Sequence, residues 1–543
     1  MGAAMQFAER ILEFAERYTT LYCYGAGVYA AAVLRFLEAQ SISPKACLVS
    51  DVVEPDAACM GVPVARFSDV VLEEDAGVIL ALDEKWHVDL TTALEKRGLA
   101  RRHIHCPTIA EINAIRIWEG VMLHPAGNGQ SKDEAAYETR YQQLLCQFAR
   151  IEVRMVGIGA VGTALHELFY HKRYGFQENN TYYLFVLLGG GEHPWENTFG
   201  KPNAFLYEAF YDTQFSAVNK ENLPFWNYVF THHMESVDIN GAWSYDFVIM
   251  DSIHKMHTGD FVGNGRTTLS LAHVEKLGEE QLKQMGVQNT FVLFFARDAV
   301  YYQQTWNGII DDPLRIMDKY RNSDIASMKK TADYLIEKGI SAVRIGATPI
   351  PDKDMGNIID YAGEFHTDAM DFYLAKHCKF YVGDHSGAMF FTVYWDRPMV
   401  MINLPVITGF YDGTFPFDHR RDLGIYHKFY SKRKKRLLNL SELLVIEDCS
   451  HEIPIYSGTI NVMMKYYEHE IVSIANTEDE ILAVTQEMEE RLQGDMEYTE
   501  EDEHLQMRYR AILSPYLEAR PDTFFCDVRI GRDFLRQNLW LTR

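Results

Sequence analysis

Residues 369–403 constrain the fold of this chain more than any other stretch. Residues 370–377 favour a helix, which leads into an apolar strand at 379–382 and then into a small polar turn. A second helix at 389–395 and a second strand at 399–403 follow. This order is typical of an open α/β sheet, in which ligands bind at the carboxyl ends of the strands. The turn consists of Gly383, Asp384, His385, Ser386 and Gly387. Its backbone N–H groups, at a helix start, suit a phosphate, and without a P-loop lysine it does not indicate ATP hydrolysis.

Two other predicted strands also end at charged side chains. The strand at 290–295 is followed by Arg297 and Asp298, and the strand at 342–345 carries Arg344 and ends at Gly346. A helix at 325–338 and a further strand at 357–361 complete this part of the pattern. Because parallel strands end at the same edge of a sheet, we expect the three strand ends to converge on one cleft.

Two glycine-rich turns lie closer to the N-terminus. In the first, strand 21–24, Gly25, Gly27, helix 28–40 and strands 46–49 and 77–82 give βαβ order, with Asp51 as the acidic residue. This is close to a dinucleotide fingerprint, but Ala30 replaces the third glycine, so binding and non-binding versions of the module remain equally supported.

The second glycine-rich turn is a full G-x-G-x-x-G motif. Gly157, Gly159 and Gly162 lie between a strand that starts at residue 151 and a helix, and the next strand is 182–188. No acidic residue follows at the spacing of a dinucleotide site. We therefore favour glycines that let the backbone turn beneath a bound sugar or phosphate over an NAD site.

Composition restricts the partners and the compartment. A net charge of −24 argues against a nucleic-acid partner. No apolar run reaches the length of a membrane span, and the N-terminus predicts an amphipathic helix rather than a signal peptide. The eight cysteines contain no CxxC pair and no zinc spacing, so we expect reduced thiols. The interpretation is a cytoplasmic protein, with peripheral binding at the inner membrane left open.

The pattern predicts five segments. They are a Rossmann-like accessory domain (1–125), a linker helix (126–150), an α/β half (151–287), a second α/β half (288–470) and C-terminal helices (471–543). Thr477 and Glu480 form a capping box for a helix that runs to about residue 492. The acidic residues of 478–503 are interpreted as a solvated helical face. Six Lys or Arg in 428–436 either face an anionic phospholipid or a pyrophosphate-linked acceptor, or form a loop that pairs with this acidic tail.

The converging residues fit a site for a sugar nucleotide. Loss of a diphosphate in glycosyl transfer places charge on phosphate oxygens, which an arginine fork and backbone N–H groups stabilise. Arg297 is the first candidate for this role and the turn at Ser386 the second, while Arg344 either adds charge or pairs with Asp360 or Asp368. Carboxylates near strand ends, Asp298 among them, are candidates for a general base. The sequence gives no metal-binding pair of aspartates in this cleft, and the pair His232 and His233 is interpreted as packing.

Four segments carry a resemblance to a known family. Residues 320–325, 343–346, 370–374 and 380–387, with the tail at 476–492 and 504–509, resemble a family of glycosyltransferases from bacterial surface-carbohydrate loci. More distantly, the Arg297 strand end and the segment from Asp371 to Ser386 are similar to GT-B fucosyltransferases of the α1,6-, protein-O- and nodulation types. The first 125 residues look like small Rossmann-like modules attached to polysaccharide-biosynthesis proteins.

The resemblance implies a GT-B fold, with two Rossmann-like halves facing a cleft, and metal-independent transfer from a nucleotide-sugar co-substrate to a glycan or lipid-linked acceptor. It implies Arg297 as the diphosphate ligand, Ser386 as a phosphate contact and Asp371 as a nucleoside contact. Arg297 and Asp298 are the predicted catalytic residues. Gly346, Asp384, His385 and Gly387 complete the donor site, and the glycines of the G-x-G-x-x-G motif belong to the acceptor side. Phe295 stands where the related motif has His, so the donor sugar need not be fucose.

Two other functions stay open at this point. A nicotinamide-dependent sugar-nucleotide oxidoreductase or epimerase would use the glycine fingerprints, but the chain offers no Tyr-x-x-x-Lys pair at residues 183–187. A non-catalytic scaffold for glycan assembly would bind nucleotide sugars without turnover.

Overall fold

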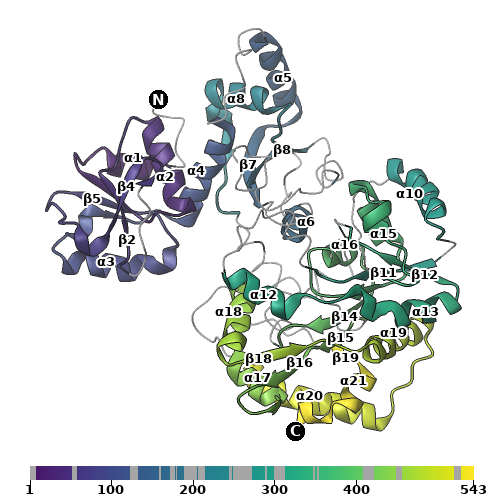
Figure 1. Cartoon of the computed structure of the whole chain (residues 1–543). Helices are drawn as coiled ribbons and strands as arrows, with labels where there is room; N and C mark the ends of the chain where they lie inside the picture. Colours follow the sequence, from purple (N-terminus) through teal and green to yellow (C-terminus); the bar gives the residue numbers. More distant parts are fainter. Residues whose placement is uncertain are drawn as a thin grey trace. The chain divides into compact units, whose positions relative to one another are not determined.

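The structure is a computed structural model with two compact units (Figure 1). The first unit comprises Met1–Ile158, Tyr174–Asn197 and Tyr211–Phe247, and the second comprises Gly159–Arg173, Thr198–Phe210 and Val248–Arg543. The described residues are 8–51, 58–122, 133–157, 161–171, 178, 180–188, 205, 214–243, 248, 272–287, 290–298, 312–346, 349–350, 354–407, 421–447, 455–518 and 528–543.

The first unit begins with a six-stranded sheet in the order β3-β4-β2-β1-β5-β6. All neighbours are parallel except β3, which pairs antiparallel with β4. The βαβ prediction for this region is confirmed. Its strands are β1 (Leu21–Tyr24), β2 (Ala46–Val49), β3 (Ala58–Cys59), β4 (Val62–Arg66), β5 (Gly77–Leu80) and β6 (Ile104–His105), and its helices are α1 (Glu9–Ala15), α2 (Val28–Ala39), α3 (His87–Lys96) and α4 (Ile109–Met122).

A second, four-stranded parallel sheet in the same unit has the order β10-β7-β8-β9. Helix α4 contacts α2 on one side and strands β7 and β8 on the other, so one apolar core joins the two sheets. The proposed boundary near residue 125 lies outside the described residues. The elements are α5 (Glu134–Gln147), β7 (Arg150–Gly157), β8 (Thr181–Leu188), β9 (Phe215–Ala217), α8 (Leu223–His232) and β10 (Val237–Ile239).

The second unit is built on a six-stranded parallel sheet in the order β12-β11-β13-β14-β15-β19. Its central strands are nearly continuous apolar runs, because helices cover both faces of a parallel sheet; all six residues of β14 are buried. The strands are β11 (Thr290–Phe295), β12 (Ile340–Arg344), β13 (Tyr381–Gly383), β14 (Met399–Leu404), β15 (Leu423–Tyr426) and β19 (Arg529–Ile530).

Helices α13 and α19 lie on one face of this sheet and α15 and α16 on the other (Figure 1). Helix α10 packs on α15, and α6, which follows the G-x-G-x-x-G motif, packs on α16. The helices are α6 (Val161–Tyr170), α10 (Ala272–Gln284), α12 (Asp312–Arg321), α13 (Lys329–Glu337), α14 (Tyr361–Glu364), α15 (Asp368–His377), α16 (Met389–Tyr394), α17 (Leu440–Glu447), α18 (Ile455–Glu468), α19 (Glu478–Gln493), α20 (Glu500–Glu518) and α21 (Arg532–Gln537). The predicted α/β class with parallel sheets is thus confirmed.

Two predicted elements of this unit need correction. The helix expected at 325–338 starts as a 3-10 turn, Ile325–Met328, before α13. The strand expected at 357–361 is wrong: only Ile359 bridges to Val343, and α14 then begins. The reason is a helix cap, since the Asp360 carboxylate accepts a hydrogen bond from the Gly363 N–H at 3.1 Å.

The basic stretch forms part of a small antiparallel sheet in the order β17-β16-β18. Its strands are β16 (Lys428–Ser431), β17 (Arg436–Leu437) and β18 (Ile471–Ile474). Four of its cations are paired with carboxylates: Lys428 with Glu480, Arg433 with Glu470, and Lys434 and Arg436 with Glu442. Of these carboxylates only Glu480 belongs to the acidic tail, so the predicted pairing with that tail holds for Lys428 but not for the other three cations.

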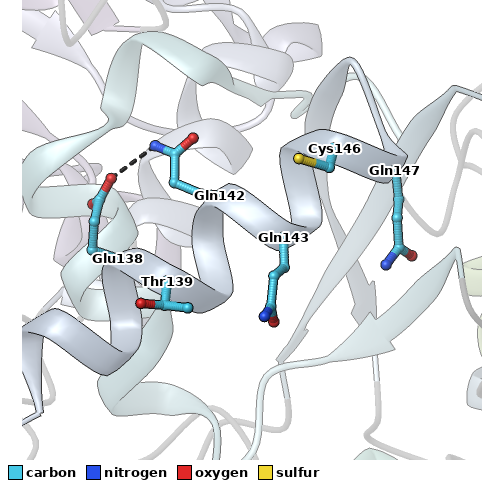
Figure 2. A pocket seen from close by; sticks show the side chains of 6 residues that line it. All are labelled: Glu138, Thr139, Gln142, Gln143, Cys146 and Gln147. Carbon is cyan, nitrogen blue, oxygen red and sulfur yellow. Dashed lines mark hydrogen bonds between the residues drawn. The ribbon is translucent and has the colours of Figure 1, made fainter.

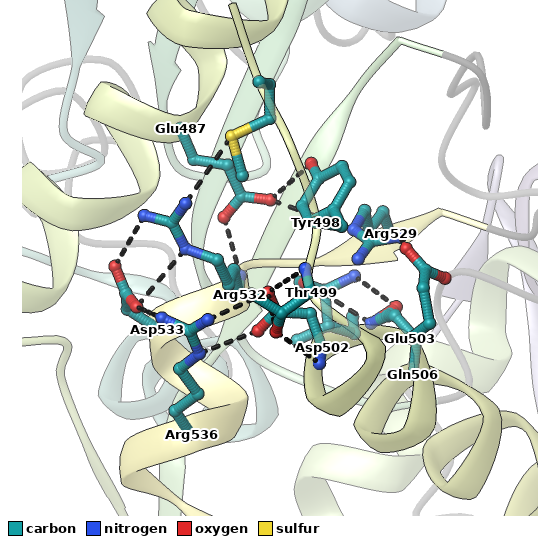
Figure 3. Close-up of polar contacts among 12 residues, drawn as sticks. Glu487, Tyr498, Thr499, Asp502, Glu503, Gln506, Arg529, Arg532, Asp533 and Arg536 are labelled. Carbon is teal, nitrogen blue, oxygen red and sulfur yellow. Dashed lines mark hydrogen bonds and ion pairs between the residues drawn. The ribbon is translucent and has the colours of Figure 1, made fainter.

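The acidic tail is not only a solvated face. The capping box of Thr477 and Glu480 is confirmed, but four of the tail carboxylates are buried: Glu480, Glu487, Glu489 and Asp502. Figure 3 shows two of them holding the C-terminal segment, where Glu487 accepts the Arg532 N–H at 2.6 Å and Asp502 accepts two N–H groups of Arg536 at 2.7 and 2.9 Å. These contacts hold β19 in place as the outermost strand of the sheet, beside β15.

Candidate functional site

Three neighbouring strand ends meet at one edge of the sheet in the second unit. Strand β11 pairs in parallel with β12 on one side and with β13 on the other. The register places Phe294 beside Arg344 and Phe295 beside Gly383. The residues that follow these strands therefore leave the sheet at the same edge, as the sequence predicts.

Asp384 connects the strand ends. Its carboxylate accepts hydrogen bonds from the Arg297 backbone N–H at 2.9 Å, from the Ser323 hydroxyl and from the Asn403 amide at 3.1 Å. Burial raises the pKa of Asp384 to about 6, although these hydrogen bonds favour the ionised form. Because the buried carboxylate accepts three hydrogen bonds from neighbouring segments, we infer that Asp384 stabilises the conformation of the turn.

Arg297 lies directly after β11, and its side chain is 4% exposed. Its guanidinium donates to the carboxylate of Asp318 on α12 at 2.8 Å and to the side-chain oxygen of Asn322. The Arg297 carbonyl also accepts the Ser323 N–H at 2.9 Å. The arginine is thus held at the strand end by the segment at 318–323, and its partner Asp318 is 21% exposed.

Arg344 takes one of the alternatives left open by the sequence. Its side chain is 3% exposed and pairs with Asp360, which also caps α14. Gly346 follows, and a Cβ added there would lie 3.5 Å from the Ala362 methyl group, so α14 packs closely against this strand end.

The turn after β13 packs against α6. A Cβ built on Gly162 would lie 2.7 Å from the Gly387 Cα atom, so the third glycine of the G-x-G-x-x-G motif allows helix and turn to approach. The Ser386 hydroxyl accepts a long hydrogen bond from the Ala388 N–H at 3.4 Å, and the His385 carbonyl accepts from Arg321 at 3.3 Å. The structure therefore brings Gly162 to the predicted phosphate turn.

The other two glycines of the motif give less information. Gly157 ends β7 in the first unit, and Gly159 lies outside the described residues. Asp298 follows Arg297 at the strand end and is partly exposed.

Asp371 is buried and faces two side chains at the start of α15. Its carboxylate accepts from the Tyr361 hydroxyl at 3.0 Å and lies 3.4 Å from His366 Nε2. Burial raises the pKa of Asp371, and the hydrogen bond to Asp371 raises the pKa of His366. The side chain of His366 is 27% exposed, whereas that of Asp371 is 10% exposed.

Sequence reasoning missed four residues of this edge: Asp318, Ser323, His366 and Asn403. Ser323 lies in a segment that carries the family resemblance, which was the available signal. Asn403 and His366 could not be identified from the sequence. Asn403 reaches Asp384 because β14 pairs with β13, and His366 reaches Asp371 because α14 lies beside α15.

Among the described residues, no group of three or more His, Cys, Asp or Glu side chains could hold a metal ion. His233 pairs instead with Glu138 at 2.6 Å and stacks on the Tyr141 ring at 3.9 Å. No helix in the described ranges is long and apolar enough to cross a membrane.

A hollow in the first unit does not fit the predicted site. Figure 2 shows that its lining side chains all come from α5. They are Glu138, Thr139, Gln142, Gln143, Cys146 and Gln147. One helix supplies them all, and Glu138 already accepts from Gln142 at 2.7 Å, so the polar groups do not converge on a ligand as the strand ends do.

Comparison with known proteins gives no family assignment. No family model matches the chain, and no curated protein matches its sequence. A glycosyl transferase family 9 structure from Veillonella parvula is similar over 59% of this chain and 98% of its own, at 10% identity and a TM-score of 0.34. The S. aureus MnaA–UDP complex is similar over 70% of this chain and 79% of its own, at 12% identity and a TM-score of 0.15. TM-scores this low are no evidence of a shared function.

Proposed function

We propose that the chain is a glycosyltransferase that moves a sugar from a nucleotide-sugar donor to a surface-glycan acceptor. The observation that carries this proposal is the meeting of three parallel strand ends in the second unit, with Arg297, Arg344 and the turn at Ser386 at one edge. Carboxyl ends of parallel strands are where open α/β sheets bind their ligands. The family resemblance of the same segments supports the class of reaction.

Glycosyl transfer needs stabilisation of the departing diphosphate, because negative charge grows on its oxygens as the glycosidic bond breaks. The backbone N–H groups of the turn before α16 are suited to hold these oxygens, with the Ser386 hydroxyl as a further donor. Arg297 supplies positive charge from the next strand end, held in place by Asp318. In this proposal the charge comes from protein groups, and the transfer is metal-independent.

The donor site belongs to the second unit alone in this proposal, since its residues lie in the segment from β11 to α16 and in β14. Three points stay predictions from the sequence. They are the acceptor (a glycan or a lipid-linked chain), membership of the surface-carbohydrate transferase family, and the boundaries of the five segments. A peripheral position at a membrane face is part of the same prediction.

Turnover of radiolabelled nucleotide sugars tests the proposal. The full chain is incubated with UDP-, GDP-, CDP- and ADP-linked sugars, and release of nucleoside diphosphate is measured with and without a glycan extract as acceptor. We expect release with one donor class, accelerated by acceptor. Binding of a donor without release would favour the scaffold, and a change in NADH fluorescence on mixing would favour the oxidoreductase.

A further inference from the structure

His366 lies between α14 and α15, at the same edge as the three strand ends. Ile359 bridges in parallel to Val343 of β12, so the chain leaves the sheet at its carboxyl edge and enters α14 there. Asp360 pairs with Arg344 at this point. Helix α15 then leads to the start of β13, so its first turn also belongs to the carboxyl edge.

Buried polar groups hold the imidazole in one orientation. His366 Nε2 lies 3.4 Å from an Asp371 carboxylate oxygen. The other oxygen lies 3.0 Å from the Tyr361 hydroxyl oxygen, which also lies 2.8 Å from the Thr367 carbonyl oxygen, so these two acceptors share one hydroxyl proton. The same hydroxyl accepts the Thr367 N–H at 3.2 Å. Tyr361 is completely buried, and its ring centre lies 5.7 Å from that of His366. Functional histidines are commonly oriented in this way. A buried carboxylate holds one ring nitrogen, and the other nitrogen binds a ligand or transfers a proton.

The exposed fractions of the two side chains favour His366, rather than Asp371, as the residue that contacts a ligand. Asp371 is the predicted nucleoside contact, but its carboxylate faces inward, toward Tyr361 and His366. The imidazole is the more exposed of the two side chains. With Nε2 directed at Asp371, Nδ1 is the ring atom that can meet a ligand.

We propose that His366 contacts the diphosphate of the donor through Nδ1, and that Asp371 and Tyr361 are positioning residues that act through its ring; this role rests on the proposed function. In the protonated ring both nitrogens donate, Nε2 to Asp371 and Nδ1 to a phosphate oxygen. The charged groups that face the ring are Asp371 and Asp368 on α15, with Tyr361 on α14, and the two carboxylates raise the pKa of His366. We therefore expect His366 to take up a proton when the donor binds.

Calorimetry on the full chain tests this role with UDP, GDP, CDP and ADP as probes. Each titration is run at about pH 7.5 in two buffers of different ionisation enthalpy, which gives the number of protons taken up on binding. His366→Gln should weaken binding of the preferred diphosphate roughly 10-fold or more and remove the proton uptake seen with the wild-type protein. Asp371→Asn should weaken binding less and reduce the uptake.

His377→Gln is the matched control, because His377 ends α15, the helix that follows His366, and also pairs with a carboxylate, Glu275, at 2.9 Å. It should leave both affinity and proton uptake unchanged, and thermal melts should show that all three variants are folded. Wild-type affinity and uptake in His366→Gln would overturn the role of His366 and leave the proposed function standing. No binding of any diphosphate to the wild-type protein would overturn both.

Discussion

Gly162 and Gly387 pack backbone against backbone. A Cβ on Gly162 would lie 2.7 Å from the Gly387 Cα atom and 2.9 Å from the Phe390 ring, closer than such atoms approach in proteins. The third glycine of a dinucleotide fingerprint serves close packing of helix and strand. Here it serves packing of α6 on the turn before α16, which explains the glycine without a dinucleotide.

Gly162→Ala should destabilise the second unit by about 1–3 kcal/mol, because the added methyl group forces α6 away from the turn. The free energy of unfolding in urea measures the effect. Gly27→Ala is the control, since a Cβ there meets no atom within 4 Å. Equal effects of the two substitutions would show that the Gly162–Gly387 contact is not tight.

Asp360→Ala should cost about 3 kcal/mol, because it removes the carboxylate that pairs with the buried guanidinium of Arg344 and also the cap of α14. Asp354→Ala breaks a comparable pair with Lys329, at 2.6 Å, but the Asp354 side chain is 79% exposed. That control should cost much less, because solvent screens an exposed ion pair. Chemical denaturation of both variants compares them, and a larger loss in Asp354→Ala would contradict the account of this edge.

Asp384 should make stability depend on pH. Its pKa is about 6 in the folded chain against an ordinary value of 3.8. A raised carboxyl pKa means that the contribution to stability is complete below about pH 4 and is lost as pH rises through about 6. The wild-type protein should therefore lose about 2–3 kcal/mol relative to Asp384→Asn between these two pH values.

Urea unfolding of both proteins across this pH range gives the difference directly. Ser323→Ala removes one donor to the ionised form, so it should raise the pKa of Asp384 further and shift the loss toward higher pH. A constant difference between wild type and Asp384→Asn at every pH would show that Asp384 does not titrate in this range.

Asp502→Asn should loosen the C-terminal segment drawn in Figure 3, because the Asp502 carboxylate receives two N–H groups of Arg536. The Ile530 N–H donates to Gln506 of α20 at 3.3 Å. We expect hydrogen exchange at this amide to accelerate, since α20 loses part of its attachment to α21, the helix that follows β19. Glu470→Gln is the control: its pair with Arg433 is more than half exposed, and exchange at Ile530 should not change. Unchanged protection in Asp502→Asn would mean that the Gln506 contact and the pairing with β15 hold β19 without the Asp502–Arg536 pair.

The strands and their common edge could be predicted because the signal is local. Apolar runs such as 290–295 and 399–403 end at small or charged residues, and the parallel order of an α/β sheet then places the ends together. The prediction of a strand at 357–361 was wrong because the Asp360 carboxylate accepts the Gly363 N–H and so starts a helix. The spacing of apolar residues does not reveal a helix cap.

The partners of the site residues could not be predicted, since they lie far away in sequence. Asp384 meets Ser323 and Asn403 across separations of 61 and 19 residues. The exposed or buried state of a carboxylate is likewise set by tertiary packing, which is why Glu487 and Asp502 were assigned to a solvated face.

The most direct test of the account is a crystal structure of the full chain with the nucleoside diphosphate that it binds. We predict density for the diphosphate at the carboxyl ends of β11, β12 and β13, within hydrogen-bonding distance of the backbone N–H groups at 385–388. Density at the Gly25 turn of the first sheet or in the hollow along α5, with the strand ends of the second unit empty, would contradict it.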